Sequence, residues 1–568
     1  MKTKEEFINL RQERGNLATS QQRAAANPSK SVWVEASAGT GKTKVLSDRV
    51  LRLLLNGVNP QRILCLTYTK AAAVEMNTRI SERLSDWAVW GEEDLDKSLF
   101  ELLGDEIKNT DILKKYKRRA RTLFAILLDT PGGIKIQTIH SFCQEVLKRF
   151  PLEAGISPYF DILDDESSKD ALTQIQKELL EQIEDEKESP VKKAMQYLTE
   201  NLTENSFPKV MMDITSNKTK IAEMLKNYKD KTDFDKALAQ KLGIFAEETE
   251  KTAIDDFMAK INIADLRANI AALLQGGKKD AERAEEFERL LLQGHLGYED
   301  YNKYKSLFLT KEGDLLKKQA DKNSCAADSQ VAERLQSEAE RVLKNEEKLC
   351  KIRLYQATSS VLAIARELNN RYQDFKNKHS RLDYEDLILL TRNLLADDSV
   401  ASWVLFKLDG GIDHILIDEA QDTSPNQWEI VKSLSTEFFA GAGSSEKKRT
   451  VFAVGDRKQS IYSFQGADPD KFDDMSVYFA EKAAADFQKI NLAVSFRSSA
   501  AVLNTVNMLF SNPENSKGVT AVDETVNHIP FRAGEFGKVE IWPLLVAEKK
   551  DKEYNQFPPI EMSREVSG

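Results

Sequence analysis

The chain of 568 residues lacks the features that mark several classes of protein. Its four cysteines, Cys65, Cys143, Cys325 and Cys350, stand far apart and form no CxxC pair, so neither a zinc ribbon nor a disulfide framework is indicated. Thiols so sparse are typical of a reducing compartment and predict a cytoplasmic protein. No aliphatic run approaches the ~20 residues that a membrane span requires, and the N-terminal residues lack the apolar segment of a signal peptide.

A surplus of basic charge is also missing. Lys and Arg number 81 against 91 Asp and Glu, which gives a net charge of −10 at pH 7. This balance argues against a histone-like coat of nucleic acid, but a local basic channel stays compatible, because phosphate contacts need only a few cations in one groove. With 41% hydrophobic residues the chain has enough apolar side chains for several buried cores, and its length corresponds to about three to five domains.

Short apolar runs alternate with helical patterns near the N-terminus. The run at residues 31–36 precedes an amphipathic helical pattern, and the run at residues 62–67 precedes another. Such strand–helix alternation predicts a parallel sheet of α/β type. The strands expected from these runs are 31–36, 62–67, 134–138, 414–418, 450–455 and 490–494.

Residues 161–380 have a different character. They are rich in charge, poor in strand signals, and carry apolar residues at helical spacing, as in LTQIQKELLEQIEDEKE. The charge runs indicate solvated helix faces. We interpret this stretch as a large helical insertion that interrupts the α/β domain.

A phosphate-binding loop is predicted where the first strand ends. The segment ASAGTGKT fits the P-loop pattern, except that Ala36 stands where the strict pattern has glycine. Small residues allow backbone N–H groups to surround phosphate oxygens at the positive end of the next helix. Lys42 is expected to neutralise the β- and γ-phosphates of ATP, and Thr43 to place its hydroxyl on Mg²⁺. A simple glycine-rich turn is the alternative, which the flanking strand and helix disfavour. The expected nucleotide-binding residues of the loop are Ala36, Ser37, Ala38, Gly39, Thr40, Gly41, Lys42 and Thr43.

An acidic pair ends the strand expected at 414–418. Asp418 is expected to hold Mg²⁺, and Glu419 to orient and deprotonate the attacking water. A hydrolase needs this second carboxylate, whereas a kinase does not. The alternative is a helix N-cap, a position that carboxylates favour. Because the pair lies far beyond Thr43, an insertion must separate the two halves of the site.

With further motifs, these residues resemble the UvrD-like superfamily-one DNA helicases, and within them the AddA family of helicase-nuclease subunits in its alphaproteobacterial form. The likeness covers most of residues 15–160 and 380–510, with the motifs in the order of the family. It implies a P-loop NTPase with a RecA-like motor domain. The segments that carry it are QRAA from Gln22, LTYTKAA from Leu66, QTIHSFC from Gln137, LDYEDL from Leu382, DEAQD from Asp418, VGDRKQSIYSFQGA from Val454 and VSFRS from Val494.

The resemblance implies nucleotide contacts outside the P-loop. Gln22, or Gln21 in an alternative register, would recognise adenine, and Phe496 would lie against the same base. Gln459 would sense the γ-phosphate, and Arg497 would stabilise its charge. The catalytic set so implied is Lys42, Glu419, Gln459 and Arg497.

The resemblance also implies contacts with DNA. A translocase must grip any sequence, which favours flat rings that stack on bases and contacts with the sugar-phosphate backbone. For each ring the alternative is a core position, and for the histidine it is a structural role. The residues expected to contact DNA are Thr67, Tyr68, Thr138, His140, Tyr462 and Phe464.

The chain departs from the family at two points. Gln465 stands where many relatives have arginine, which removes one possible phosphate contact. The later motor motifs and the nuclease have no counterpart before Gly568, so we expect a truncated, N-terminal portion. The expected division is a first motor domain in two parts, 1–160 and 381–488, the insertion at 161–380, and the start of a second motor domain with a tail at 489–568.

The sequence therefore predicts an ATP-dependent 3′–5′ DNA helicase or translocase that acts in double-strand break repair and recombination. ATP and Mg²⁺ are the expected cofactors. By resemblance, the partners are single-stranded DNA, duplex ends and an AddB-type subunit, with no membrane. The alternative is a non-catalytic ATP- or DNA-binding subunit of a helicase-nuclease complex. A small-molecule P-loop kinase would leave the downstream motifs unexplained.

Overall fold

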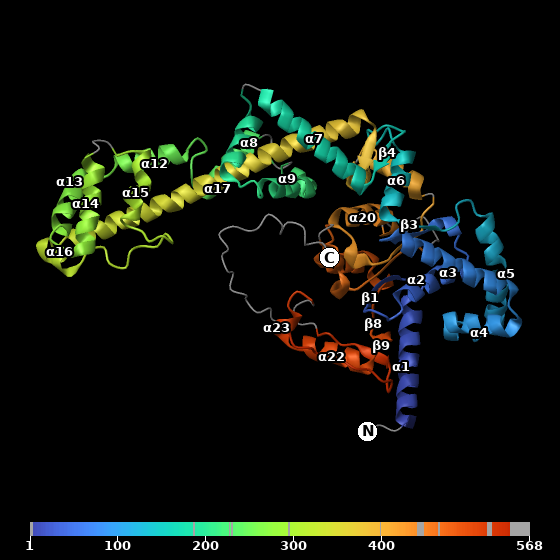
Figure 1. The fold of residues 1–568 in the computed structure, drawn as a ribbon. Coiled ribbons are helices and arrows are strands. Elements are labelled where there is room, and N and C mark those ends of the chain that lie inside the picture. Colours follow the sequence, from blue (N-terminus) through green and yellow to red (C-terminus); the bar gives the residue numbers. More distant parts are fainter. Residues whose placement is uncertain are drawn as a thin grey trace, which may run out of the picture. The chain divides into compact units, whose positions relative to one another are not determined.

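The computed structural model describes residues 4–185, 188–225, 228, 231–292, 296–397, 399–409, 411–439, 448–463, 466–519 and 525–545. The chain forms two compact units (Figure 1). The α/β unit consists of Met1–Tyr159 with Tyr384–Gly568, and the helical unit consists of Phe160–Asp383. The helical unit thus occupies the stretch in which the sequence pattern predicts an insertion.

One six-stranded parallel sheet forms the centre of the α/β unit. Its strands lie in the order β3-β2-β6-β7-β1-β8, and every neighbouring pair is parallel. The predicted fold class, a parallel α/β sheet interrupted by a helical insertion, is confirmed. The strands are β1 (Ser31–Ala36), β2 (Ile63–Thr67), β3 (Lys135–Thr138), β6 (His414–Ile417), β7 (Thr450–Gly455) and β8 (Phe487–Leu492).

Strand β8 differs from its prediction. The pattern predicts a strand at 490–494, but β8 pairs with β1 from Phe487 to Leu492. The domain boundary expected after residue 488 stays a prediction. Val494 instead begins β9 (Val494–Ser499), which pairs with β10 (Ile529–Arg532). The error has a physical cause: β8 is an edge strand in which Ile490 and Leu492 are the only buried residues, so its apolar signal is weak.

Helices cover both faces of the sheet. Alternate residues of β1 point to opposite faces, so Val32 and Val34 join a core formed with α2 and α3. Trp33 points the other way, and its ring centroid lies 5.8 Å from Trp428 and 4.8 Å from Phe472. The helices of this unit are α1 (Lys4–Ala25), α2 (Lys42–Leu55), α3 (Lys70–Val89), α4 (Glu92–Leu103), α5 (Thr110–Asp129), α6 (Ile139–Arg149), α18 (Tyr384–Ala396), α19 (Ala401–Asp409), α20 (Pro425–Phe439), α21 (Pro469–Ala483), α22 (Ala500–Phe510) and α23 (Pro513–Ser516).

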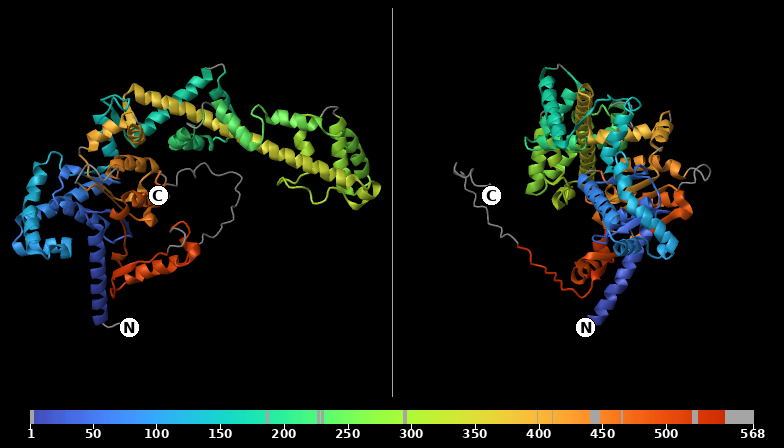
Figure 2. Two further views of the ribbon diagram at one scale, coloured as in Figure 1. Left: turned by 180° about the vertical axis from the view of Figure 1, so that it is seen from behind. Right: turned by 90° about the vertical axis from the view of Figure 1, so that its right-hand side faces the viewer.

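The helical unit is organised along α17 (Val331–Lys378), a helix of 48 residues (Figure 2). The buried side chains of its first half recur at three- and four-residue spacing, as in Leu335, Ala339 and Val342, and join a core with α12 to α15. Its second half joins a separate core with α7 and α8. The other elements of this unit are β4 (Asp161–Leu163), α7 (Asp165–Asp185), α8 (Pro190–Asn201), α9 (Phe207–Ser216), α10 (Lys218–Leu225), α11 (Lys231–Leu242), α12 (Glu250–Ala259), α13 (Ile263–Leu273), α14 (Lys278–Leu292), α15 (Tyr301–Ser306), α16 (Lys322–Ala327) and β5 (Arg381–Asp383).

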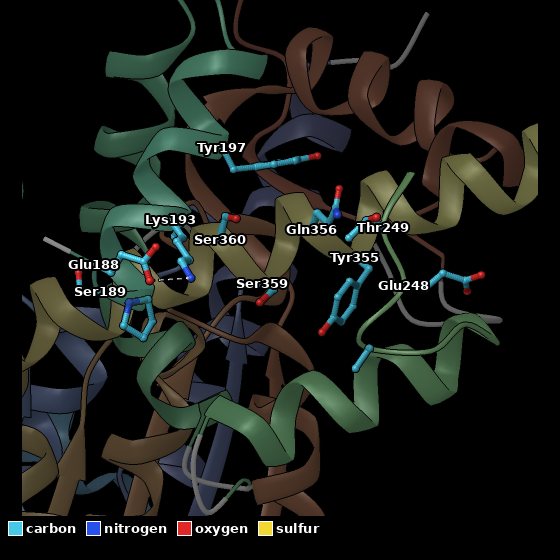
Figure 3. Close-up of a pocket in the computed structure, with 13 residues that line it drawn as sticks. Glu188, Ser189, Lys193, Tyr197, Glu248, Thr249, Tyr355, Gln356, Ser359 and Ser360 are labelled. Carbon is cyan, nitrogen blue, oxygen red and sulfur yellow. Dashed lines mark ion pairs between the residues drawn. The ribbon is translucent and has the colours of Figure 1, made fainter. Parts of the chain in front are cut away.

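A cavity of about 440 Å³ lies within the helical unit, between α8, the residues before α12, and α17 (Figure 3). Hydroxyl and amide groups such as those of Tyr197, Gln356 and Ser360 line it. Of its charged lining residues, Lys193 Nζ pairs with Glu188 at 3.5 Å, and Glu248 pairs with Lys348. Among the described residues, none of those predicted to bind a nucleotide or DNA lines this cavity.

The described ranges contain no helix whose length and apolar character would allow it to cross a membrane. All four cysteines are free thiols, as their spacing predicts. Cys65 and Cys143 are buried in the α/β unit, and Cys350 is exposed on α17.

Arg49 of α2 is fully buried beneath the sheet, which the helical pattern does not reveal. Its guanidinium donates to the carbonyl oxygens of Asn27 and Lys30, and to Thr450 Oγ1 at 3.0 Å. It also lies over the ring of Phe452, 5.0 Å from the centroid. Burial lowers its pKa to about 9, so the group keeps its charge at neutral pH. Arg49 therefore ties the P-loop helix to β7.

We expect Arg49→Met to lower the free energy of unfolding by about 2–4 kcal/mol, because three acceptors would lose a donor where water has little access. Equilibrium urea unfolding at pH 7 measures this change. Arg118→Met, on the exposed face of α5, is the matched control and should shift the value by less than about 0.5 kcal/mol. An Arg49→Met variant as stable as the parent would contradict the assignment.

Candidate nucleotide site and tyrosine pair

The predicted site residues gather at the carboxyl edge of the central sheet. Because the strands are parallel, the loops that follow β1, β2, β6 and β7 leave this same edge. Leu66 of β2 lies opposite Ile417 of β6, which in turn lies opposite Ala453 of β7. The three strands therefore end at nearly the same level, and motifs far apart in the sequence become neighbours.

The loop after β1 has the backbone of a phosphate cradle. Gly39 and Gly41 have φ angles of 76° and 96°, a region that glycine adopts without cost. Gly39 also allows a close approach, since a Cβ there would lie 2.4 Å from Arg497 Cβ. The N–H and hydroxyl groups of Thr40 both bond to the carbonyl oxygen of Ser37, at 3.3 and 2.8 Å. These bonds close the turn ahead of α2.

Lys42 joins the two halves of the predicted site. Its Nζ lies 2.6 Å from Glu419 Oε2 and 3.4 Å from Gln459 Oε1. A carboxylate thus lies against the ammonium, at a place that suits another oxyanion such as a phosphate. Glu419 has a φ of 47°, which is unusual for a residue with a side chain and is a form of strain that clusters at functional sites.

The loop opens on a cavity of about 570 Å³, a size typical of small-molecule sites. Ala36 and Thr40 are buried in the loop instead of facing this space, and Asp418 is not part of its lining. The predicted residues that line the cavity are Gln22, Ala38, Gly39, Gly41, Lys42, Thr43, Glu419, Gln459, Phe496 and Arg497.

Strand β9 brings the last predicted motif to the P-loop. The N–H of Phe496 donates to the carbonyl oxygen of Gly39 at 2.8 Å. The hydroxyl of Ser495 donates to the carbonyl oxygen of Ala38 at 3.0 Å. These two bonds hold Phe496 and Arg497 at the wall of the cavity.

Of the two glutamine registers, the geometry favours Gln22. Its Nε2 donates to the carbonyl oxygen of Thr40 at 3.1 Å, and its side chain lines the cavity. Gln21 does not line the cavity. An amide fixed against the P-loop is well placed to distinguish the edge of a purine base.

Asp418 lies at the end of β6, next to Glu419. Burial and the charge of Glu419 raise the pKa of Asp418 to about 6, while the ammonium of Lys42 acts in the opposite direction. The N–H of Glu419 donates to Asp418 Oδ1 at 3.1 Å. Glu419 stands at the N-cap position of the short helix η4 (Ala420–Asp422), but its side chain makes no capping bond there.

This donor set fits ATP and Mg²⁺. Two adjacent carboxylates repel each other, and a divalent cation would relieve that repulsion. Within the described part of the chain, no group of three or more His, Cys, Asp or Glu side chains could hold a metal alone. Mg²⁺ commonly takes one or two carboxylates and completes its shell with phosphate oxygens and water. Thr43 and Asp418 are the residues that would hold it here, together with a bound triphosphate.

Two tyrosines from separate loops lie against each other, with tilted rings, at the same edge of the sheet. The rings of Tyr68, after β2, and Tyr462, after β7, have centroids 4.5 Å apart and planes at 39°. Burial, Tyr462 and Asp422 raise the pKa of Tyr68 to about 12, so its phenol is neutral. The structure therefore brings two of the predicted base-contacting rings together. Phe464 and Gln465 lie outside the described residues.

The other residues predicted to contact DNA make internal contacts. Thr67 is buried, and its hydroxyl donates to the carbonyl oxygen two residues later at 3.1 Å. Thr138 is also buried, and its side chain caps the start of α6. The ring of His140 lies edge-on to Tyr384, with centroids 5.5 Å apart. Each side chain therefore has a structural role, and its predicted contact with DNA stays a prediction.

Sequence reasoning assigns no role to several residues that the structure places at the site. Lys44, Arg79 and Glu101 also line the cavity. Gln421 and Asp456 bond to the predicted carboxylate and glutamine, at 2.8 and 2.6 Å. Asp456 directly follows the buried strand β7, and Gln421 lies four residues beyond the end of β6, which is a usable signal. Arg79 and Glu101 sit on helices whose polar faces give none.

Comparisons with known proteins agree with this geometry. Residues 17–311 and 285–480 match the UvrD/REP helicase N-terminal domain. An ATP-dependent helicase/nuclease subunit from Lactobacillus helveticus is 27% identical over 526 residues, which cover 87% of this chain and 40% of that protein. The protein of the same name from Acetivibrio thermocellus is 27% identical over 547 residues, which cover 88% of this chain and 39% of that protein. The protein of the same name from Enterococcus faecalis is 25% identical over 593 residues, which cover 98% of this chain and 43% of that protein.

The chain thus spans about two fifths of the length of these curated relatives. The domain match covers more than half of the chain and includes the P-loop, the helical unit and the acidic pair. The predicted resemblance to UvrD-like helicases and to helicase-nuclease subunits is confirmed, while its alphaproteobacterial form stays a prediction. The chain belongs to the UvrD/REP helicase family, whose N-terminal domain it contains.

Proposed function

We propose that this chain is the ATP-hydrolysing motor portion of a DNA helicase that moves 3′ to 5′ along a single strand. The meeting of Lys42, Glu419 and Gln459 at one cavity carries the proposal. The name of the relatives supports a role in a helicase-nuclease complex, which we place in the cytoplasm at duplex ends, in double-strand break repair and recombination. An AddB-type partner and the direction of movement rest on the family resemblance.

The chemistry follows from an exchange of partners at Lys42. A triphosphate in the cavity would offer Lys42 a stronger anion than a carboxylate. Glu419 Oε2, which now accepts from Lys42, would then be able to accept a proton from water. Mg²⁺ would supply charge neutralisation at the phosphates. Gln459 and Arg497 line the same space and would contact the terminal phosphate.

The grip on DNA would come from the tyrosine pair. Stacking on a base does not depend on its identity, which suits a motor that moves over any sequence. The rings of Tyr68 and Tyr462 already pack against each other in a tilted arrangement, so a base would replace this ring-ring contact with ring-base contacts. Tyr68 and Tyr462 follow β2 and β7, at the sheet edge where the proposed nucleotide contacts also lie. Nucleotide and DNA would therefore bind at one edge of the sheet.

Lys42→Ala should weaken ATP binding by about 2–3 kcal/mol, because hydrogen bonds to charged groups contribute that much. Fluorescence titration with a labelled ATP analogue measures the affinity, and a phosphate-release assay follows hydrolysis. Lys471→Ala, which removes a surface lysine paired with Asp474, is the matched control and should bind ATP like the parent. Full hydrolysis by Lys42→Ala would contradict the assignment of this cavity as the ATP site of a motor. A parent chain that binds ATP without hydrolysing it would favour the non-catalytic role.

Removal of Mg²⁺ by EDTA should lower the affinity for ATP by roughly tenfold, because the phosphate charge would be left partly uncompensated. In Asp418→Asn the same treatment should have a smaller effect, because one ligand of the metal is already missing. Isothermal titration with and without EDTA gives both values. Equal affinities for the parent under the two conditions would exclude the metal site assigned to Thr43 and Asp418.

Tyr462→Ala should weaken binding of an oligo-dT strand by about 1–3 kcal/mol, the range measured for loss of one stacked ring. Tyr462→Phe keeps the ring and should bind within about twofold of the parent. Fluorescence anisotropy of a labelled oligonucleotide measures both. If the alanine and phenylalanine variants bind the oligonucleotide equally well, the ring of Tyr462 only packs inside the protein, and its proposed contact with DNA is contradicted.

A further inference from the structure

Gln421 has both ends of its amide engaged inside the protein. The residue is 1% exposed. Its Nε2 donates to Glu419 Oε2 at 2.8 Å and to Asp422 Oδ2 at 3.1 Å, and its Oε1 accepts from the N–H of Asp456 at 2.9 Å. A flipped amide would place oxygen against two carboxylates and NH₂ against an N–H group. The orientation of this side chain is therefore fixed by its surroundings.

The backbone of β7 makes room for this amide. A Cβ at Gly455 would lie 2.6 Å from Gln421 Oε1 and 3.1 Å from its backbone nitrogen. Glycine is thus required where β7 ends, for the approach of Gln421 to the next residue. The hydroxyl of Ser460 adds a longer contact, 3.4 Å, to the carbonyl oxygen of Gln421.

These contacts complete a closed ring of hydrogen bonds. Lys42 donates to Glu419, which also accepts from Gln421, which accepts from Asp456. Asp456 Oδ2 accepts from Gln459 Nε2 at 2.6 Å, and Gln459 Oε1 accepts from Lys42 at 3.4 Å. The ring joins the P-loop, the turn after β6 and the turn after β7.

A phosphate at Lys42 would open this ring at Lys42, and at Gln459 where that residue contacts the terminal phosphate. The bonds from Glu419 through Gln421 to Asp456 lie in the rest of the ring, and Gln421 is only 1% exposed, so these bonds persist when Lys42 changes partner. Gln421 then holds the carboxylate in place as Lys42 leaves it. The same amide anchors the start of the segment that leads to Tyr462, while its contact Asp422 lies close enough to Tyr68 to raise that phenol's pKa.

We infer that Gln421 is a positioning residue that aims Glu419 and couples the nucleotide cavity to the Tyr68–Tyr462 pair. The inference rests on the proposed function and deepens it, because it names the residue through which the two sites affect each other. Coupling of this kind is a ratio of affinities: nucleotide changes the affinity for a single strand by a factor, and the strand changes the affinity for nucleotide by the same factor.

The test measures this factor with the full chain, Mg²⁺, a non-hydrolysable ATP analogue and labelled oligo-dT. For the parent we expect a change in oligo-dT affinity of at least about fivefold on addition of the analogue. Gln421→Met keeps the length of the side chain but neither donates nor accepts as an amide does. It should bring the factor to about one, with each ligand alone bound within about threefold of the parent.

Gln427→Met is the matched control. Gln427 is also buried, six positions further on, but its amide oxygen bonds to the N–H of Ser424 at 3.0 Å and takes no part in the ring. In Gln427→Met the analogue should change the affinity for oligo-dT by the same factor as in the parent. Gln421→Glu serves as a second variant, since it retains the acceptor for Asp456 and loses the donor to Glu419; it should also uncouple the sites.

The possible outcomes distinguish a failure of the Gln421 inference from a failure of the proposed helicase function. If the parent binds neither the analogue nor oligo-dT, the proposed function fails. If the parent binds both and Gln421→Met keeps the same factor, or if the parental factor is one, the inference is overturned. Failure of both Gln421 variants to fold, with Gln427→Met intact, would make Gln421 a purely structural residue and would overturn it too.

Discussion

The ion pair between Lys42 and Glu419, 377 positions apart in the chain, is the interaction on which the site depends. It exists because β1 and β6 are parallel strands of one sheet whose carboxyl ends lie at the same edge, with β7 between them. The pair is partly buried, with side-chain exposures of 11% and 36%, so the ammonium and the carboxylate each need a partner. A triphosphate offers Lys42 another partner, and the site can therefore respond to nucleotide by an exchange of bonds.

The helical unit explains how the chain tolerates so long a separation between the two halves of its site. It builds its own apolar cores along the two halves of α17, and these do not draw on the residues of the central sheet. The short parallel pair of β4 with β5 brings the beginning and the end of this unit together. The two parts of the α/β unit can therefore fold as one sheet, although more than two hundred residues lie between them.

The sequence predicts well what depends on local pattern. Apolar residues dominate the buried strands β1 and β7, and the P-loop is a spacing of small residues before Lys42, so both are visible without a structure. Strand β8 is half exposed and gives a weaker signal, which explains why its bounds differ from the predicted ones. The burial of Arg49 could not be predicted, because its acceptors come from turns that no local pattern brings near α2. The contacts of Gln421 likewise depend on the register of β6 with β7.

The exchange of partners at Lys42 is tested most directly by an experimental structure of the chain with Mg²⁺ and a non-hydrolysable ATP analogue. We expect Lys42 Nζ to bind phosphate oxygens and to have left Glu419, while Gln421 still bonds to both Glu419 and Asp456. A nucleotide bound elsewhere, or one bound in the cavity while the Lys42–Glu419 pair stays intact, would show that the exchange does not occur.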